Sequence, residues 1–240
     1  MTSQHAILTA EAHRDLAVRT DHGPAYGDAQ MCCITVPSEF RAVQGSYPIL
    51  FRLNDTRDHF TALAMFGFEN GENLFLEDGR WDARYRPLAM AIQPFLIGGA
   101  PGGDGVRQVH VDLASPRIAT DGNGVRLFDE LGQPTPYLAQ MAEQLRSLDE
   151  GYCAAPAFFA ALQRYDLLEP FTLDVTLDDG SRNRLVGFHI IDEDRLAALD
   201  AVALADLQAA GHLLPIYMAI ASLAHLGDLV ARRNHRLSRG

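Results

Sequence analysis

The sequence has 240 residues and a formal net charge of −11, which together bound its size class and its partners. A chain of this length forms one large domain or two small ones and can bury a substantial core. The strong negative charge argues against nucleic acid as a partner, because phosphate binding needs a basic surface. All 20 cationic side chains are Arg, so chemistry that depends on Lys, such as Schiff-base formation, is excluded.

The N-terminal segment, residues 1–16, does not have the pattern of a signal peptide, because it has no basic start, apolar core or small-residue cleavage site. The most apolar stretch, Leu213–Leu226, is interrupted by Pro215 and His225. It is shorter than the roughly 18 apolar residues that a membrane span needs, so we expect a buried helix there. The sequence therefore favours a cytoplasmic protein without a membrane-inserted segment.

The three cysteines, Cys32, Cys33 and Cys153, do not suggest a disulfide framework, because their number is odd and two of them are adjacent. Neighbours in a strand point to opposite faces, so Cys32 and Cys33 are not expected to pair with each other. We expect three reduced, mostly buried thiols in a reducing compartment.

The first half of the chain is expected to be rich in strands. After a mostly irregular segment to residue 30, apolar and β-branched runs predict strands over residues 31–36, 49–53, 60–68, 74–76, 89–97 and 106–113. The polar segment 54–58 predicts a hairpin turn, and the glycine-rich segment 98–103 predicts a flexible loop. A further hairpin is predicted at Asp178–Ser181, between strands around residues 173–177 and 185–191.

Helices are expected in the second half. Thr135 is a candidate N-cap with Pro136 at the first helical position, and this helix is expected to end near Leu148. Further helices are predicted over residues 154–165, over 201–210 between Asp200 as N-cap and Gly211, and from Pro215 to about Arg233.

Hairpins followed by helices indicate an α+β fold, in which a mainly antiparallel sheet, flat or curled, is covered by helices concentrated in the C-terminal half. We expect a single domain over residues 1–240, which is β-rich over 30–130 and helical with one β-hairpin over 135–236.

The most distinctive segment is Gly79–Pro87, which contains the only Trp of the chain, three Arg and one Asp. In an extended chain its polar and aromatic side chains would lie on opposite faces: Arg80, Asp82, Arg84 and Arg86 against Trp81 and Tyr85. One interpretation is structural, with the Trp in the core and the Arg and Asp in fixed ion pairs. The other is a site for an anionic ligand or a peptide, with Arg for a carboxylate and the rings as contact surface. This segment is the first candidate site.

A second candidate site consists of His110 and Asp112 on a predicted strand and His189 on a later strand, with Arg195 six residues beyond it. Two His and one carboxylate form the metal site of non-haem Fe(II) oxygenases, in which an Arg after the distal His anchors 2-oxoglutarate. Short motifs of this kind also arise by chance. The alternative is therefore a set of surface or hydrogen-bonded histidines.

Several short segments, taken in order, resemble one family. They are LTAEAHRDL at Leu8–Leu16, VPSEF at Val36–Phe40, YPILF at Tyr47–Phe51, the segment Gly79–Pro87, Ser115–Ile118, Leu127–Glu130, Gly132–Leu138, Leu168–Pro170 and Ile216–Met218. As a set they resemble the SapC family, a group of bacterial proteins of similar length, over nearly the whole chain. The family pattern includes the carboxylate of Asp112 but not His110, which argues against a metal triad.

The resemblance implies a soluble accessory or binding protein of a bacterial surface, uptake or modification system. SapC-like proteins are associated with surface layers, and their genes are found beside flavin-dependent halogenase-like enzymes, cupin-like oxygenases and TonB-dependent receptors. The resemblance thus implies a partner protein, such as a halogenase-like enzyme, or a small anionic ligand.

The sequence favours a non-catalytic role, because it contains no nucleophile elbow, dinucleotide-binding fingerprint or zinc-protease motif. We therefore expect no cofactor. The alternative is an oxygenase that uses Fe(II) and 2-oxoglutarate, with His110, Asp112 and His189 as metal ligands and Arg195 holding the cosubstrate.

Overall fold

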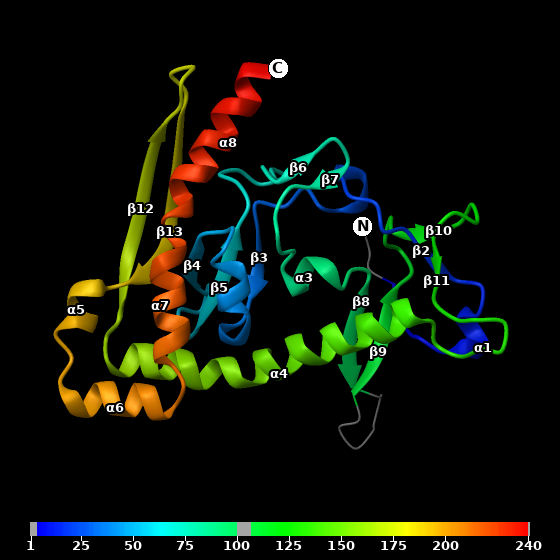
Figure 1. Ribbon diagram of the computed structural model, residues 1–240, viewed down its shortest axis with the longest axis horizontal. Helices are drawn as coiled ribbons and strands as arrows, with labels where there is room; N and C mark the ends of the chain where they lie inside the picture. Colours follow the sequence, from blue (N-terminus) through cyan, green and yellow to red (C-terminus); the bar gives the residue numbers. More distant parts are fainter. Residues whose placement is uncertain (1–3, 100–106, 240) are drawn as a thin grey trace. The chain divides into compact units, whose positions relative to one another are not determined.

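The computed structural model describes residues 4–99 and 107–239, which form helices and antiparallel sheets (Figure 1). The predicted α+β class is confirmed, and no sheet of the described residues closes into a barrel. The chain divides into two compact units. Unit 1 holds the described residues of 1–28, 78–80 and 88–150, and unit 2 holds those of 29–77, 81–87 and 151–240. The single domain expected over the whole chain stays a prediction.

Unit 1 contains two small antiparallel sheets. The first has the strand order β1 (His5–Ile7), β9 (Arg107–Asp112), β8 (Phe95–Gly99), and the second β10 (Ile118–Ala119), β2 (Ala17–Val18), β11 (Val125–Arg126). Helices α1 (Ala10–His13) and α3 (Leu88–Ala91) and the 3-10 turn Pro24–Tyr26 complete the short elements. The core forms where Val111 of β9 packs with Met141 and Leu145 of α4 (Pro136–Arg164).

A buried ion pair holds the N-terminal segment of unit 1. Arg117 Nη2 lies 2.5 Å from Asp28 Oδ1, and the two side chains are 2% and 0% exposed. Arg117 Nη1 also donates to the carbonyl of Asp21 at 3.0 Å, and the backbone N–H of Gly23 donates to Asp28 Oδ2 at 2.9 Å. A buried charge is tolerated when it is paired and hydrogen-bonded, so these contacts give Arg117 a structural role.

Unit 2 is built on a five-stranded antiparallel sheet. The strand order is β12 (Leu168–Thr176), β13 (Arg182–Ile191), β4 (Ile49–Leu53), β5 (Phe60–Met65), β3 (Cys32–Thr35). The predicted hairpins β4–β5 and β12–β13 are both confirmed. A smaller hairpin joins β6 (Leu76–Glu77) to β7 (Arg80–Trp81). Its turn residues Asp78 and Gly79 have φ of 48° and 74°, as a two-residue hairpin turn requires.

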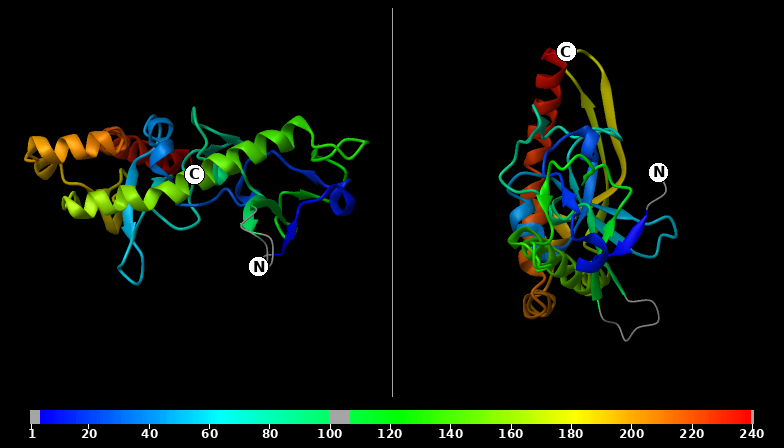
Figure 2. Two further views of the ribbon diagram at one scale, coloured as in Figure 1. Left: turned by 90° about the horizontal axis from the view of Figure 1, so that it is seen from below. Right: turned by 90° about the vertical axis from the view of Figure 1, so that its right-hand side faces the viewer.

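The helices of unit 2 are α2 (Phe40–Val43), which follows a 3-10 turn at Pro37–Glu39, the second half of α4, α5 (Glu193–Ala197), α6 (Ala201–Ala209), α7 (Leu213–Ser222) and α8 (His225–Arg239). Phe40 of α2 and Phe158 of α4 meet edge to face with ring centroids 5.9 Å apart, and Phe51 of β4 meets Phe159 of α4 at 6.2 Å, so α4 packs on both α2 and the sheet. Helix α8 lies alongside the β12–β13 hairpin (Figures 1 and 2). Asn234 of α8 accepts the backbone N–H of Asp178 at 3.0 Å.

Helix α4 is one helix where the sequence predicted two. Thr135 caps it as expected, since its Oγ1 accepts the backbone N–H of Leu138 at 3.4 Å. The helix then continues through Gly151 and Pro156, which are residues that usually mark an interruption. Proline removes one helical hydrogen bond, but Phe158 and Phe159 are only 1% and 8% exposed. Their burial favours continuation, so packing overrides the local preference.

Four other predictions need correction. Residues 88–91 are helical rather than extended, and the following strand is β8. The expected final helix is divided at residues 223–224 into α7 and α8. Cys153 is exposed rather than buried, whereas Cys33 is buried as expected. In the predicted loop 98–103, Gly98 and Gly99 belong to β8, and residues 100–103 lie outside the described residues.

The sequence predicts a buried helix at Leu213–Leu226, but in the segment Leu213–Arg239 only 22% of the most apolar 18-residue window is buried. The segment is long and apolar enough to cross a membrane by length and composition alone, with a mean hydropathy of 1.6. This is weak evidence, because core helices of soluble proteins meet the same criterion. The absence of membrane insertion stays a prediction.

Candidate functional site

The aromatic side chains of the segment Gly79–Pro87 are anchored in unit 2. Trp81 Nε1 donates a hydrogen bond to the Tyr47 hydroxyl at 2.7 Å, and its ring meets Phe66 edge to face at 5.3 Å. The Tyr47 hydroxyl donates in turn to the backbone carbonyl of Tyr85. Burial raises the pKa of the fully buried Tyr47, so its hydroxyl stays a donor.

The second ring of the segment, that of Tyr85, is held by a buried carboxylate. Its hydroxyl donates to Glu39 Oε1 at 2.8 Å, and Thr35 Oγ1 donates to Glu39 Oε2 at 2.8 Å. Glu39 is 5% exposed. Burial, together with the Glu39 charge, raises the pKa of Tyr85. These contacts favour the structural interpretation for both Trp81 and Tyr85.

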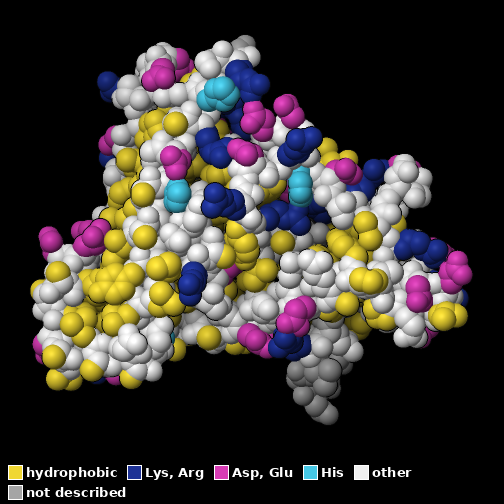
Figure 3. Space-filling view, in the orientation of Figure 1, with side chains coloured by type: hydrophobic (Ala, Val, Ile, Leu, Met, Phe, Trp, Pro, Cys, Tyr) yellow, Lys and Arg dark blue, Asp and Glu magenta, His cyan; other side chains and the backbone are white. Residues whose placement is uncertain are grey.

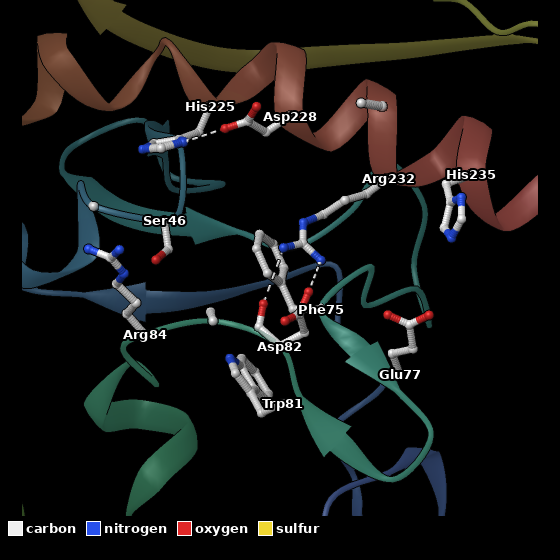
Figure 4. Close-up of a pocket in the computed structure, with 13 residues that line it drawn as sticks. Ser46, Phe75, Glu77, Trp81, Asp82, Arg84, His225, Asp228, Arg232 and His235 are labelled. Carbon is white, nitrogen blue, oxygen red and sulfur yellow. Dashed lines mark hydrogen bonds and ion pairs between the residues drawn. The ribbon is translucent and has the colours of Figure 1, made fainter.

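The polar face of the same segment lines a groove of about 740 Å³, which we call the α8 groove (Figure 4). Asp82 and Arg84 form one wall together with Trp81. The opposite wall is the polar face of α8, and the ends are formed by the 45–46 and 75–77 segments. The side chains that bring chemistry to it are Ser46, Phe75, Glu77, Asp82, Arg84, His225, Asp228, Arg232 and His235.

Arg232 is fixed across the middle of the α8 groove. Its Nη1 lies 2.7 Å from Asp82 Oδ2, and Nη2 donates to the Asp82 carbonyl at 3.2 Å. Its guanidinium carbon lies 4.4 Å from the centroid of the Phe75 ring, within reach of a cation–π interaction. Arg232 is therefore already occupied by groups of the protein.

Further arginines of α8 bind it to residues 72–77 of unit 2, which lie far from α8 in the sequence. Arg233 forms an ion pair with Glu72, Arg236 donates to the carbonyls of Asn73 and Leu76 at 3.0 Å each, and Arg239 pairs with Glu77. Hydrophobic residues gather elsewhere in the view of Figure 3, over α6 and α7, whereas charged side chains of both signs gather over α8. The α8 groove therefore has a rigid and strongly polar wall.

Ser46, His225 and Asp228 are the residue types of a Ser-His-Asp triad and line the same groove. His225 Nδ1 lies 2.7 Å from Asp228 Oδ2, as in a triad, but Nε2 lies 2.9 Å from the carbonyl oxygen of Gln44. A carbonyl oxygen can only accept a hydrogen bond, so Nε2 is the donor in this contact and faces Gln44 rather than Ser46. The nitrogen that would act as base for Ser46 is thus already committed, and the arrangement does not support a serine nucleophile.

Arg84 differs from the other arginines of the α8 groove. It is exposed, and it has no hydrogen bond or ion pair with any residue that the structure describes. Its side chain lies at the end of the groove where Ser46 and His225 lie (Figure 4). Its positive charge is therefore available to a group that enters the groove from outside.

The other two arginines of the segment do not line the α8 groove. Arg80 is exposed on β7 and belongs to unit 1. Arg86 is half-buried, and its charge acts on the buried Tyr47 hydroxyl. Of the six residues predicted as a site, Trp81, Asp82 and Arg84 thus lie at the groove, whereas Arg80, Tyr85 and Arg86 do not.

The structure places the predicted metal ligands in different units: His110 and Asp112 on β9 of unit 1, and His189 on β13 of unit 2. Asp112 Oδ1 accepts the backbone N–H groups of Gln4 at 3.0 Å and Ala114 at 3.1 Å, as an acid does in a structural turn. The His110 ring packs on Gly98, where a Cβ would lie 2.7 Å from Nε2.

Local contacts hold the His189 ring and Arg195, although His189 Nδ1 is buried without a hydrogen-bond partner among the described residues. The His189 ring lies edge to face on Phe60 at 5.0 Å, and burial, followed by the charge of Arg57, lowers its pKa. Arg195 pairs with Asp166 and with Asp192. Over residues 4–99 and 107–239, no group of three His, Cys, Asp or Glu side chains is arranged to hold a metal ion. Nothing described favours the oxygenase alternative.

The fold and the groove define a small α+β protein with an open surface groove of mixed charge. The chain belongs to the SapC family, whose family model matches residues 8–229. This match includes both units and confirms the family predicted from the sequence. No curated protein and no solved structure shows significant similarity to the chain.

Sequence analysis missed the half of the α8 groove that comes from α8. The sequence predicts only a helix from Pro215 to about Arg233 there and assigns no site to it. One signal was available: the cationic residues of α8 repeat at helical spacing, while acidic residues are frequent over 69–82. Such a match between distant segments indicates pairing, although it does not identify the groove.

Proposed function

We propose that this SapC-family protein is a non-catalytic accessory protein, which uses the α8 groove to hold an acidic side chain or chain terminus of a partner protein. The observation that carries the proposal is Arg84, an exposed guanidinium in the groove without a partner among the described residues. Arg forms bidentate contacts with carboxylates and is enriched at interface positions that dominate binding.

The arrangement around Arg84 supports protein recognition rather than catalysis. Arg232 already pairs with Asp82, and His225 lies against Asp228, so Arg84 is the guanidinium of the lining that is left for an incoming carboxylate. The rings of Phe75 and Trp81 line the same groove and offer flat contact area. The groove is open and large enough for several side chains, which suits a segment of a protein.

The setting of the proposed partner follows from the family. We propose that the protein described here is soluble and cytoplasmic and works in a bacterium, within a surface, uptake or modification system. A flavin-dependent halogenase-like enzyme is the partner to test first, and a small anionic ligand is the competing occupant of the groove.

The test is native mass spectrometry of the protein isolated gently from its own host, as wild type and as Arg84→Ala. We expect the wild-type protein to be metal-free and to co-purify with a second polypeptide, and Arg84→Ala to lose that polypeptide. Loss of an interface Arg typically weakens binding by about 30-fold, which corresponds to about 2 kcal/mol. Arg80→Ala is the matched control, because Arg80 is equally exposed but does not line the groove.

Three results would contradict the proposal. Retention of the partner by Arg84→Ala, or its loss from both variants alike, would remove the groove from the interaction. A mass excess of one iron on the wild-type protein would instead return attention to His110, Asp112 and His189.

A further inference from the structure

Unit 2 has a second groove, of about 350 Å³, which we call the α7 groove. It is lined by the 3-10 turn before α2, the second half of α4 and the N-terminal part of α7. Pro37, Phe158, Pro215 and Met218 make most of its lining apolar. Its volume lies within the roughly 300–1,000 Å³ range of small-molecule sites.

Among the described residues, Arg41 is the one charged side chain in the lining of the α7 groove. This lining contains Arg41, Ser38 and His212 and no Asp or Glu, although the chain as a whole has a net charge of −11. Arg41 is exposed and has no hydrogen bond or ion pair with a described residue. The α8 groove, by contrast, includes Glu77, Asp82 and Asp228 in its lining. The α7 groove is therefore locally positive on a negatively charged protein.

The N-terminus of α7 adds donors at the same place. This helix has ten residues, and its N-cap, His212, makes no side-chain capping hydrogen bond. The backbone N–H groups of Leu213 and Leu214 find no acceptor among the described residues, and Pro215 has no N–H. Unsatisfied N–H groups and the positive end of the helix dipole together favour an anion. The N-terminus of α7 and the Arg41 side chain are independent features, and both line the α7 groove.

Close packing limits the size of the occupant. Gly151 of α4 lies against Val36 and Ser38 so closely that a Cβ would come within 2.6 Å and 2.7 Å of their side-chain atoms. Only glycine allows this approach, which brings α4 against the turn that carries Ser38 and sets one boundary of the groove. A small molecule thus fits the volume of about 350 Å³ better than a polypeptide segment, which needs a longer groove.

We propose that the α7 groove binds a small amphiphilic monocarboxylate, such as a medium-chain fatty acid. Its apolar body packs on Pro37, Leu214 and Met218, while its carboxylate meets Arg41 and the N-terminus of α7. A carboxylate matches the fork of an Arg side chain, and a single negative charge suits a site with one guanidinium. This site is separate from the α8 groove and from the function proposed for it.

The test is a calorimetric titration of the full chain with sodium decanoate, with 1-decanol as the neutral probe of the same length. We expect saturable binding of one decanoate per chain and at least about tenfold weaker binding of decanol. Arg41→Gln should weaken decanoate binding by about tenfold or more, because it removes a charge-assisted contact. Arg182→Ala is the matched control, because Arg182 is exposed and lines neither groove, and it should bind decanoate like the wild type.

Three outcomes would overturn the proposal: no saturable decanoate binding, decanol binding as tight as decanoate binding, or unchanged affinity in Arg41→Gln. Arg41 is exposed, so the substitution is not expected to unfold the chain, and an unchanged thermal melting curve verifies this. A second variant, Met218→Asp, places a negative charge in the lining and should abolish binding. Unchanged binding by that variant would place decanoate elsewhere.

Discussion

Two arginines, one in each unit, show how the surroundings of one residue type decide its role. Arg117 of unit 1 is 2% exposed and bonded to Asp28 and to backbone carbonyls. Arg84 of unit 2 is exposed and has no partner among the described residues. Both belong to segments that resemble the SapC family, so the resemblance alone does not separate structure from recognition. Burial and hydrogen bonding do separate them: Arg117 stabilises the fold, and Arg84 is available to a ligand.

The largest loss of stability is expected from Asp28→Ala, which tests the structural role of Arg117. The substitution leaves Arg117 buried without its carboxylate, and breaking a buried pair in this way costs about 3–5 kcal/mol of unfolding free energy. Urea denaturation measures the loss. Asp121→Ala is the control, because Asp121 pairs with Arg19 at the surface and is 46% exposed. Equal stability of the two variants would show that Arg117 does not need its partner.

A smaller loss is expected from Tyr85→Phe, which removes the hydrogen bond to the buried Glu39 carboxylate. A hydrogen bond to a charged group contributes about 1.5–3 kcal/mol to stability, so the unfolding midpoint in urea should fall accordingly. Binding through the α8 groove should persist, since Tyr85 does not line it. Loss of binding with unchanged stability would show that Tyr85 takes part in recognition rather than in stabilising the fold.

The tyrosines Tyr47 and Tyr85 predict that the stability of the protein falls at alkaline pH. The pKa values of Tyr47 and Tyr85 are raised in the folded protein, chiefly by burial. Their contribution to stability is complete below the unfolded value of about 10 and is lost as the pH rises toward the folded values. Tyrosinate absorbance should therefore show these two rings ionising only when the chain unfolds. Early ionisation of every Tyr would contradict the buried network.

The smallest effect on stability is expected from Arg84→Ala. Arg84 is exposed and unpaired in the described structure, so the melting temperature should match that of the wild type. Differential scanning calorimetry with Arg232→Ala beside it sharpens the test, because Arg232 contacts Asp82 and Phe75. If Arg84→Ala lowers the melting temperature as much as Arg232→Ala does, Arg84 is a structural residue.

Local patterns predicted much of the fold. Alternating apolar residues and turn residues gave the β4–β5 and β12–β13 hairpins, and polar caps gave the starts of α4 and α6. Local patterns failed where packing overrides propensity. Gly151 and Pro156 look like an interruption, yet α4 continues because Phe158 and Phe159 are buried on the sheet of unit 2. Helix continuity there depends on contacts distant in the sequence.

Only one of the two walls of the α8 groove could be predicted from the sequence. The alternation of polar and aromatic residues correctly separated Asp82 and Arg84 from Trp81 and Tyr85 as anchors. The other wall of the α8 groove is about 150 residues away in the chain, at Arg232. Local periodicity carries no information on such a pairing, so His225, Asp228 and Arg232 could not be assigned to the site from the sequence.

The position of Trp81 has an optical consequence. It is the single indole of the chain, it lines the α8 groove, and its N–H is held by a buried phenol. All tryptophan emission of the protein therefore originates at the groove wall, in one fixed orientation. A partner that excludes water there will shift this emission, and a partner with a near-ultraviolet chromophore will quench it by energy transfer. The molecule thus carries a built-in fluorophore at the surface where binding is proposed, and association can be followed without attaching a dye.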